Sequence, residues 1–470
     1  MTVEKTNLSP FITFKVNEQS FLFDGGNGII SKVDSIIVDI LELARTYDLY
    51  SQSEEIVEIL SSQYSEGELQ NAIEAIKTSR EEGFLNSSGK VYDFFEKEYS
   101  DSSFKGNLWL NVTDSCNLNC RYCFEKEGGK VQKENNMSIE VAKNCIDYWY
   151  AHINKEQNIY DIVFFGGEPL LNKEVIIFAI NYINSLLKDL KGIPRYNITT
   201  NGTILDDELI NLFSSNTFFV NVSIDGLRAI HDKNRPYSSG ASTYDRVVSN
   251  LKKLNGAVTK LSAFICLTKY DIPYFKQSVF WLWNMGIKNV YGNLVFGKDQ
   301  IYGYEEYREY ENQLKDLAEI TYNNIIDGKP YVYNSFIENI KSLHKKNFTS
   351  NCYLWQNGIF IFSPNGNAYK CYRFLGDERY KMGNINDADL DILSKKIKKE
   401  KIEKCTDCWF QLFCGDGCPY EHDVYTGDIN KPAELLCVKS KIAFQESLKL
   451  YARLQMEAPH RLKAVLGGKI

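Results

Sequence analysis

Six short apolar runs in the middle of the chain constrain the fold more than any other feature. They alternate with polar or glycine-rich segments and with stretches of helical periodicity such as SIEVAKNCIDYWYAHI and EVIIFAINYINSLLKDL. Buried strands that alternate with amphipathic helices build a parallel sheet. We therefore predict an α/β fold centred on a partial (β/α)6, TIM-like barrel. The six runs are LWLNVT, DIVFF, YNITT, FFVNVSI, AFICLT and NVYGNLVF.

The cysteines are unevenly distributed along the chain. There are twelve, none comes before Cys116, and seven lie between Cys352 and Cys437. The start, MTVEKTNLSPF, lacks the basic and then apolar order of a signal peptide, so we expect a cytoplasmic protein. In a reducing compartment, grouped cysteines bind metal or take part in redox chemistry more often than they form disulfides.

Charge and hydropathy argue against two classes of partner. The net charge of -7 gives no bulk attraction to phosphate groups, so a nucleic-acid partner is not expected. We find no run of the ~18 apolar residues that a bilayer span requires, so no membrane partner is expected either.

Three cysteines occupy one short loop directly after the first barrel strand, in the order Cys116-Asn-Leu-Asn-Cys120-Arg-Tyr-Cys123. Three thiolates can hold three irons of a [4Fe–4S] cluster and leave the fourth iron without a protein ligand. An open metal position in a protein usually binds a substrate or cofactor. A structural zinc site would need four ligands, and no histidine lies near this loop. We therefore expect an open iron–sulfur cluster.

This CxxxCxxC loop resembles the signature of the radical S-adenosylmethionine (SAM) enzymes. The resemblance implies that the amine and carboxylate of SAM chelate the open iron. An electron from the cluster would then cleave the sulfonium into methionine and a 5′-deoxyadenosyl radical. Cys116, Cys120 and Cys123 would be metal ligands and catalytic residues at once.

Segments at the ends of later strands resemble the SAM-binding segments of the same family. Gly166-Gly167-Glu168 looks like the family's GGE segment, in which the glycines let the backbone approach the methionyl group and Glu168 accepts from its ammonium. Tyr122 falls where the family places an aromatic ring beside adenine. Asp225 suits a ribose hydroxyl, and Arg235 suits the carboxylate of SAM. The carboxylate and ribose side would be met by Thr200, Asn201, Ser223, Asp225 and Arg235.

The seven cysteines near the end of the chain form a second, denser group. The pairs Cys405-x2-Cys408 and Cys414-x3-Cys418 could by themselves form one zinc ribbon. Seven cysteines exceed one tetrahedral site, and their spacing resembles the SPASM extension of radical SAM enzymes, which carries two auxiliary [4Fe–4S] clusters. The run GIFIFSPNGNAYKCYRF predicts a hairpin within this region, with Asn365-Gly366 at its turn.

The SPASM resemblance also implies a ligand set for each auxiliary cluster. The outer cluster would be held by Cys405, Cys408, Cys414 and Cys437. The inner cluster would be held by only three, Cys352, Cys371 and Cys418. An open iron can bind and deprotonate a thiol, so our hypothesis is that a substrate cysteine ligates the inner cluster before bond formation.

The residue after the hairpin cysteine departs from one branch of the family. Sulfatase-maturing relatives place an aspartate there as a base, whereas this chain has Tyr372. The difference argues against formylglycine formation. Tyr372 could still move a proton or an electron, so Cys371 and Tyr372 are both candidate catalytic residues.

The cysteine-free start predicts a small separate unit. Three short strands, FITFKV, FLFD and GIISKV, precede three helical stretches, as in a winged-helix-like domain. DNA binding is weakened because the third helix carries at least as many acids as bases. A sheet edge that captures a peptide as an added strand is the other use. Such units before a radical SAM/SPASM core resemble the leader-peptide recognition elements of ribosomal-peptide maturases.

These regions predict three domains. Residues 1–100 would form the winged-helix-like leader-recognition domain, residues 101–345 the radical SAM partial barrel, and residues 346–470 the cysteine-rich iron–sulfur domain. The polar run FEKEYSDSSFKG would be a linker. Cys145 and Cys266 are expected to be core residues, and His422 is not expected to be a ligand.

Together these features predict an oxidoreductase that modifies a ribosomally synthesised precursor peptide. It would use three [4Fe–4S] clusters, SAM and an electron donor such as a flavodoxin or ferredoxin. The predicted product is a thioether between a cysteine sulfur and a carbon of another residue, as made by sactipeptide and ranthipeptide synthases. Carbon–carbon crosslinking or epimerisation on the same scaffold is one alternative. A non-catalytic iron–sulfur or zinc regulator that binds DNA is the other.

Overall fold

The computed structural model describes residues 8–86, 106–127, 135–297, 299–348, 352–355, 358–394, 397 and 399–468. The expected linker at residues 95–106, and the predicted domain boundary at residue 100, lie almost entirely outside the described residues.

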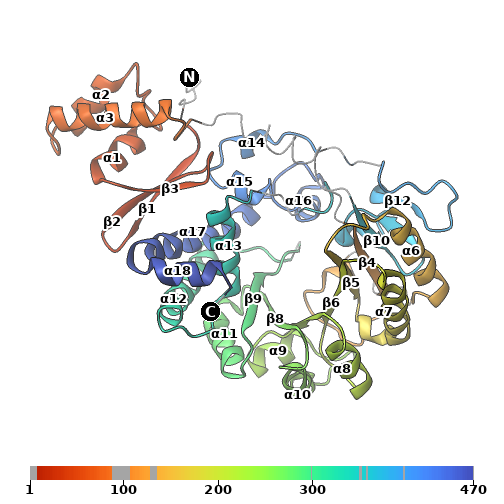
Figure 1. The fold of residues 1–470 in the computed structure, drawn as a ribbon. Helices are drawn as coiled ribbons and strands as arrows, with labels where there is room; N and C mark the ends of the chain where they lie inside the picture. The colour runs from red at the N-terminus through yellow and green to blue at the C-terminus, as the bar shows by residue number, and fades with distance from the viewer. Residues whose placement is uncertain are drawn as a thin grey trace.

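A nine-stranded sheet forms the centre of the molecule, in the order β12-β11-β10-β4-β5-β6-β7-β8-β9. The strands from β10 through β9 in this order all run parallel. In Figure 1 the sheet curves into an arc with helices on its outer side. The α/β class with a mostly parallel sheet is confirmed, and each predicted run coincides with a strand. The six strands are β4 (Asn107–Thr113), β5 (Ile159–Gly166), β6 (Ile193–Thr200), β7 (Phe218–Ser223), β8 (Lys260–Leu267) and β9 (Asn289–Leu294).

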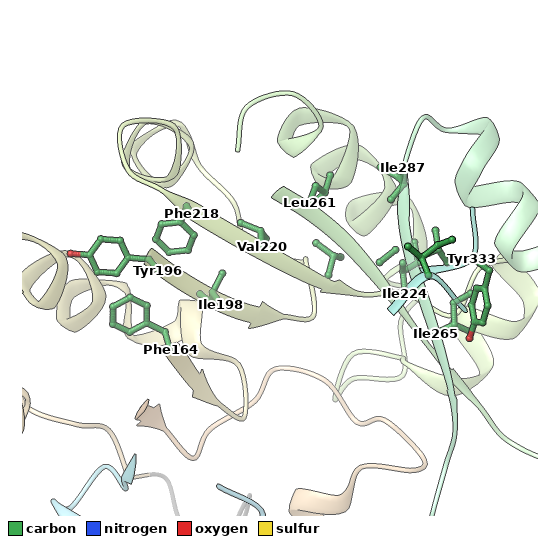
Figure 2. Close-up of a cluster of buried hydrophobic side chains, with 14 of the residues drawn as sticks. Phe164, Tyr196, Ile198, Phe218, Val220, Ile224, Leu261, Ile265, Ile287 and Tyr333 are labelled. Atoms are coloured by element: carbon green, nitrogen blue, oxygen red, sulfur yellow. The ribbon is translucent and has the colours of Figure 1, made fainter. Parts of the chain in front are cut away.

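Alternate side chains of these strands fill the layer between the sheet and its helices. Phe164 stacks on Tyr196 with ring centroids 6.2 Å apart, and Tyr196 stacks on Phe218 at 5.8 Å. Figure 2 shows these rings side by side on neighbouring strands. Because side chains alternate along a strand, the residues between them face the inside of the arc. That inner face is where the candidate site lies.

Helices cover the outer face of the sheet. The first two are α6 (Ile139–His152) and α7 (Lys173–Leu187), and Cys145 is fully buried on α6, as expected. The stretch Pro169–Leu187 is long and apolar enough to pass as a membrane span by length and composition, which differs from the expectation that the chain has no such run. Ile176, Ile180 and Ile183 of α7 are completely buried in the protein core. The later helices are α8 (Asp207–Ser214), α9 (Arg228–Asn234), α10 (Tyr244–Leu254), α11 (Phe275–Asn284), α12 (Tyr304–Ile326) and α13 (Asn334–Lys345).

The hairpin of the cysteine-rich region extends the barrel sheet. Strand β10 (Ile359–Phe362) pairs in parallel with β4, and β11 (Asn367–Tyr369) and β12 (Lys381–Asn384) follow antiparallel. The turn lies at the expected Asn365-Gly366, where Gly366 has a φ of +75°. The predicted domain boundary at residue 345 therefore separates segments that share one sheet.

Residues 8–86 form a small unit with its own core. A three-stranded antiparallel sheet, in the order β1-β2-β3, is followed by three helices, as the sequence indicated. Ser65 caps the third helix in a reciprocal capping box with Glu68. The elements are β1 (Phe11–Val16), β2 (Gln19–Asp24), β3 (Ile29–Val33), α1 (Ser35–Leu43), α2 (Ser53–Leu60) and α3 (Glu66–Glu81).

This N-terminal sheet packs against the cysteine-rich region. The ring of Phe23, which is completely buried, lies about 6 Å from the rings of Trp409, Phe413 and Phe444. A Cβ on Gly25 would lie 2.1 Å from the carbonyl oxygen of Trp409, so the two backbones are in direct contact. Figure 1 shows the sheet beside α15 and α17. The region contains α14 (Glu403–Thr406), α15 (Gln411–Cys414), α16 (Pro419–Thr426), α17 (Glu434–Glu457) and α18 (Pro459–Leu466).

Candidate active site

The three-cysteine loop leaves the end of β4 and is fixed by backbone hydrogen bonds. Asn119 N–H donates to the carbonyl of Pro236 at 2.8 Å, and Arg121 N–H donates to that of Asn234 at 3.0 Å. Both acceptors lie at or just beyond the end of α9. The loop is therefore held between the first barrel strand and the segment after the fourth.

The three thiols of this loop line one cavity and lie close together. Burial raises the pKa of the Cys116 thiol to about 12, and the charges of Glu168, Cys120 and Cys123 add to the rise. Leu118 N–H donates to the Cys116 sulfur at 3.4 Å. The structure thus brings together the three residues expected to hold the open cluster.

The two glycines after β5 allow that strand to end against the cysteine loop. A Cβ on Gly166 would lie 2.2 Å from the carbonyl oxygen of Thr113, and one on Gly167 would lie 2.4 Å from that of Ser115. Gly166 also has a φ of +144°, which L side chains rarely adopt. The Cβ positions of both glycines face protein backbone, and both residues line the cavity. Their approach to the methionyl group of SAM stays a prediction.

Glu168 is completely buried and ties the ends of β5 and β6 together. Its carboxylate accepts from Thr200 Oγ1 at 2.7 Å and from the N–H of Asn201 at 2.6 Å. Burial raises its pKa to about 7, against the lowering effect of these hydrogen bonds. Asn201 also approaches the Cys116 sulfur with its side-chain amide, at 3.9 Å. Contact of Glu168 with an ammonium of SAM stays a prediction.

Asp225, Arg235 and Tyr122 form a buried network on the other side of the cavity. Arg235 Nε lies 3.1 Å from Asp225 Oδ1, and its guanidinium lies 5.2 Å from the ring centre of Tyr122. The Tyr122 hydroxyl donates to Asp225 Oδ2. In the structure Asp225 and Arg235 are each other's partner. Contact of Asp225 with a ribose hydroxyl and of Arg235 with the carboxylate of SAM stays a prediction.

His231 also belongs to this network, and the sequence does not indicate it as a site residue. Its Nδ1 accepts from the N–H of Asp225 at 3.3 Å, and its Nε2 lies 2.9 Å from Thr243 Oγ1. Burial lowers its pKa to about 4, so the ring is neutral at neutral pH. No local sequence pattern indicates this contact, because residues 225 and 231 belong to different elements.

Cys266 is not the core residue that the sequence predicted. It lies on β8 between the buried Ile265 and Leu267, so its side chain alternates to the inner face of the arc and lines the cavity. Its N–H donates to Asp225 Oδ1 at 3.0 Å. The alternation along the run AFICLT indicates the direction of Cys266, because Ile265 and Leu267 on either side of it face the helices.

The cavity extends from the three-cysteine loop to a set of charged side chains. It has a volume of about 360 Å³ and reaches Arg373, Glu421 and Lys439. Glu421 accepts ion pairs from Arg373 at 3.2 Å and from Lys439 at 3.1 Å. Each of the three is close in sequence to a C-terminal cysteine. Arg373 lies two positions after Cys371, Glu421 three after Cys418, and Lys439 two after Cys437. One cavity therefore borders both the first cysteine group and the neighbours of the second.

The seven C-terminal cysteines are brought together in two sets. Burial raises the pKa of Cys352 to about 12 and of Cys371 to about 11, and a neighbouring Cys418 adds to both rises. Burial likewise raises the pKa of Cys414, and the nearby Cys437 and Cys408 add to the rise. The pKa of Cys405 is also raised by burial, with contributions from Cys414, Cys437 and Cys408. These are the sets expected for the inner and outer clusters. The ligation itself stays a prediction.

In the described ranges, no three Cys, His, Asp or Glu side chains converge closely enough to hold one metal ion. His422 is buried, and its Nδ1 lies 3.3 Å from the carbonyl oxygen of Ile429.

Tyr372 lies outside the lining of the cavity. Its ring stacks on Trp109 at 4.9 Å and meets the edge of Phe165 at 5.0 Å. Arg373 Nε donates to its hydroxyl at 3.3 Å. Among the neighbours of Cys371, Arg373 borders the cavity. A catalytic role of Tyr372 stays a prediction.

A curved parallel sheet with three cysteines on the loop after its first barrel strand is the arrangement expected of a radical SAM domain. Residues 110–279 match the model of the Radical SAM superfamily, so this part of the chain is a radical SAM domain. A cysteine-type anaerobic sulfatase-maturating enzyme from Clostridium novyi is 26% identical over 334 residues, which cover 65% of this chain and 86% of that protein. The radical SAM cyclopropyl synthase TigE from Paramaledivibacter caminithermalis is 24% identical over 406 residues, 81% of each chain.

A solved structure shares the fold. The structure described as anSMEcpe with bound AdoMet superposes with a TM-score of 0.65 at 21% identity, covering 77% of this chain and 98% of that one. The same protein with bound AdoMet and Cp18Cys peptide gives a TM-score of 0.61 at 19% identity, again over 77% and 98%. At this identity the likeness concerns the fold alone.

Proposed function

We propose that the protein is a radical SAM maturase that forms a thioether crosslink in a ribosomally synthesised precursor peptide. One observation carries the proposal. A single cavity borders the three-cysteine loop at one side and Arg373, Glu421 and Lys439, next to the C-terminal cysteines, at the other. A peptide in this cavity would contact both cysteine regions at once.

Cys116, Cys120 and Cys123 would hold a [4Fe–4S] cluster, with SAM bound beside it. When bound, this pair supplies a 5′-deoxyadenosyl radical, which removes a hydrogen atom from a substrate carbon. Tyr122, Arg235, Ser223, Thr200 and the two glycines line the cavity and would form the walls of the SAM site. Asp225 and Glu168 lie directly behind them and would fix their positions through the hydrogen bonds described above.

The two C-terminal sets of cysteines would hold auxiliary clusters, for a total of three. Joining a carbon radical to a thiolate sulfur forms one bond and releases one electron, so this reaction needs an electron acceptor. Cys352, Cys371 and Cys418 would hold the cluster nearest the cavity with an open iron, at which a substrate thiol would bind. The outer cluster would be held by Cys405, Cys408, Cys414 and Cys437. An external donor such as a flavodoxin or ferredoxin would reduce the enzyme.

The N-terminal unit would bind the leader of the precursor. Strand β3 pairs with β2 on one side, and no strand of the described residues pairs with its other edge. Its residues Ile29–Val33 are partly exposed, whereas β2 is almost entirely buried. An extended peptide can add to such an edge through backbone hydrogen bonds, with alternate side chains giving specificity. The related structure with bound peptide supports a peptide substrate for this fold.

Carbon–carbon bond formation is the second candidate. It is favoured by the match to the cyclopropyl synthase TigE, which covers 81% of this chain. Formylglycine formation is disfavoured because Tyr372, which stacks on Trp109 and meets the edge of Phe165, stands where sulfatase-maturing relatives have an aspartate base. Thioether formation is favoured over carbon–carbon bond formation and formylglycine formation, because an inner set of only three cysteines would leave one iron free to bind a substrate thiol.

Mass spectrometry of the reacted peptide tests the proposal. A short cysteine-bearing peptide encoded next to this gene would serve as the substrate, incubated anaerobically with the reconstituted enzyme, SAM and a reductant. Loss of two hydrogens with a cysteine that no longer reacts with iodoacetamide supports the thioether. Loss of two hydrogens with a reactive cysteine indicates a carbon–carbon bond, and modification at unchanged mass indicates epimerisation. Either of these last two results would overturn the thioether proposal.

A further inference from the structure

The middle strand of the N-terminal sheet is buried on both of its faces. Residues 20–24 of β2 are all buried. Leu22 packs into the core that the sheet shares with helices α1, α2 and α3, whereas its neighbour Phe23 packs into the core of the barrel and the cysteine-rich region. Because side chains alternate along a strand, the sheet lies between its own helices and the rest of the protein.

The contact of this sheet with the cysteine-rich region is formed by aromatic rings. The ring of Phe23 meets that of Trp409 edge to face at 6.1 Å and that of Phe413 at 6.0 Å. The turn after β2 enters the same contact, since a Cβ on Gly28 would lie 2.6 Å from the ring of Phe348 and 3.4 Å from that of Phe413. The N-terminal unit is therefore seated on residues 409–413, which we name the docking segment.

The docking segment lies between two cysteines of the outer set. Trp409 directly follows Cys408, and Phe413 directly precedes Cys414. The helices in this part of the chain, α14 and α15, have only four residues each. A single helical turn is not stable by itself, because its nucleation costs more than its first hydrogen bonds return. The docking segment therefore takes its shape from its surroundings.

Helix α17 is one of these surroundings. The ring of Phe444 on α17 lies 4.7 Å from that of Phe413 and 6.2 Å from that of Trp409. Cys437, the last cysteine of the outer set, precedes Phe444 by seven residues on the same helix. Side chains seven residues apart lie on one face of a helix. The face of α17 that packs on the docking segment is thus also the face that carries Cys437.

We propose that the outer cysteine set is the anchor of the N-terminal unit, because the metal bound by its four thiols fixes the docking segment against α17. The inference rests on the proposed function in one respect, since it takes the outer set to hold an iron–sulfur cluster. Metal binding to a segment that is not stable by itself contributes folding free energy to that segment. The segment folded in this way presents Trp409 and Phe413 to Phe23.

The proposed leader site depends on this anchor. Phe23 pairs in register with Ile30 of β3, whose other edge is the proposed site of the leader. Loss of metal from the outer set loosens β2 and, through the same register, β3. The outer set thus acts on the leader part of the substrate, whereas the inner set acts on the part that is crosslinked.

Hydrogen–deuterium exchange of the full-length, anaerobically reconstituted enzyme tests the anchor without a substrate. Mass spectrometry follows the backbone amides of residues 11–33 in Cys408→Ala and in Cys437→Ala. Each variant lacks one ligand of the outer set, and iron content should fall by about one four-iron cluster per chain. We expect the amides of β2 and β3 to exchange faster by a factor of about ten or more in both variants. The amides of α7, in the barrel, should stay protected.

Cys371→Ala is the matched control, because it removes a ligand of the inner set. It should lose a similar amount of iron and leave the exchange of β2 and β3 unchanged. Cys437 belongs to α17 and is no neighbour of the docking segment in sequence. Its variant therefore separates loss of metal from local damage, and it decides the matter if Cys408→Ala does not fold.

Unchanged exchange of β2 and β3 in a Cys437→Ala protein that has lost its outer cluster would overturn the inference. Equally fast exchange in Cys371→Ala would also overturn it, since that result means that any loss of iron loosens the whole cysteine-rich region. A parent protein whose outer set binds no iron would contradict the proposed function and the anchor together, and the iron content of the parent distinguishes this result from the other two.

Discussion

Asp225 and Arg235 form a buried ion pair in the wall of the candidate SAM site, with Arg235 Nε 3.1 Å from Asp225 Oδ1 and side chains 7% and 0% exposed. The same carboxylate accepts from the hydroxyl of Tyr122, which lies within the three-cysteine loop. The ends of β7 and α9 are thus linked to the loop that carries the first cysteines. A change at Asp225 should therefore affect both stability and the SAM site.

Asp225→Asn should destabilise the protein by about 3–5 kcal/mol, because it leaves the buried Arg235 without its counter-charge. Chemical unfolding measures this difference, and equilibrium binding measures the weaker affinity for SAM that should accompany it. Asp245→Asn is the matched control, since Asp245 pairs with Arg228 on the surface, where it is 76% exposed. The control should leave stability and SAM binding unchanged. Equal stability of the two variants would contradict the role given to Asp225.

Gly167→Ala should prevent assembly of the first cluster. The added methyl group would lie 2.4 Å from the carbonyl oxygen of Ser115 and 2.9 Å from that of Asp114, so the cysteine loop would have to move. We expect the variant to bind less iron and to release at least tenfold less 5′-deoxyadenosine. Gly67→Ala is the control, because a Cβ on this helical residue meets nothing within 4 Å. It should keep full activity and gain about 0.4–1 kcal/mol of stability.

Stability should fall in mild acid because of His231. Burial lowers its pKa to about 4 in the folded protein, while an unfolded histidine has a pKa near 6.5. Between these two values the unfolded chain binds a proton that the folded chain does not, so stability is lost as the pH falls below about 6.5. The loss approaches about 3 kcal/mol near pH 4.

Urea unfolding of His231→Gln at several pH values between 7.5 and 5 measures this contribution. The free energy of unfolding of the variant should depend less on pH than that of the unchanged protein. His460→Gln, at an exposed position, should keep the original dependence. A parallel pH dependence in His231→Gln and the unchanged protein would show that another group is responsible.

Phe23→Ala should weaken the outer cysteine set through packing. Phe23 is completely buried and contacts Trp409 and Phe413, each adjacent in sequence to a cysteine of that set. Loss of a buried Phe ring typically costs about 3–5 kcal/mol. We expect iron content to fall by about one four-iron cluster per chain, while release of 5′-deoxyadenosine persists. Phe280→Ala, at a 36% exposed position, should retain its iron.

The strands and the site loops could be predicted because their signals are local. A strand buried by helices on its outer face and by the cavity on its inner face is apolar along most of its length, and each site segment directly follows such a run. The pairing of β10 with β4 could not be predicted, since the two strands are about 250 residues apart and nothing in either run specifies its neighbour. For the same reason the sequence does not indicate that the hairpin of the predicted C-terminal domain extends the barrel sheet.

Within the site, the sequence identified residue types better than partners. Its spacing indicates which cysteines are neighbours, but it does not indicate that Asp225 and Arg235 are paired with each other. It also missed Glu421, whose ion pairs with Arg373 and Lys439 join segments that are far apart in the chain. Side chains that neutralise one another across elements leave no pattern in a single sequence.

The most direct test compares Cys120→Ala with Cys371→Ala in reactions with SAM, a reductant and the precursor peptide, scored for 5′-deoxyadenosine and for crosslinked peptide. Cys120 belongs to the loop that would hold the SAM cluster, and Cys371 to the inner set beyond the cavity. We predict that Cys120→Ala abolishes both products, whereas Cys371→Ala still releases 5′-deoxyadenosine but makes no crosslink. Normal crosslinking by Cys371→Ala would contradict the claim that the two cysteine groups act on one substrate.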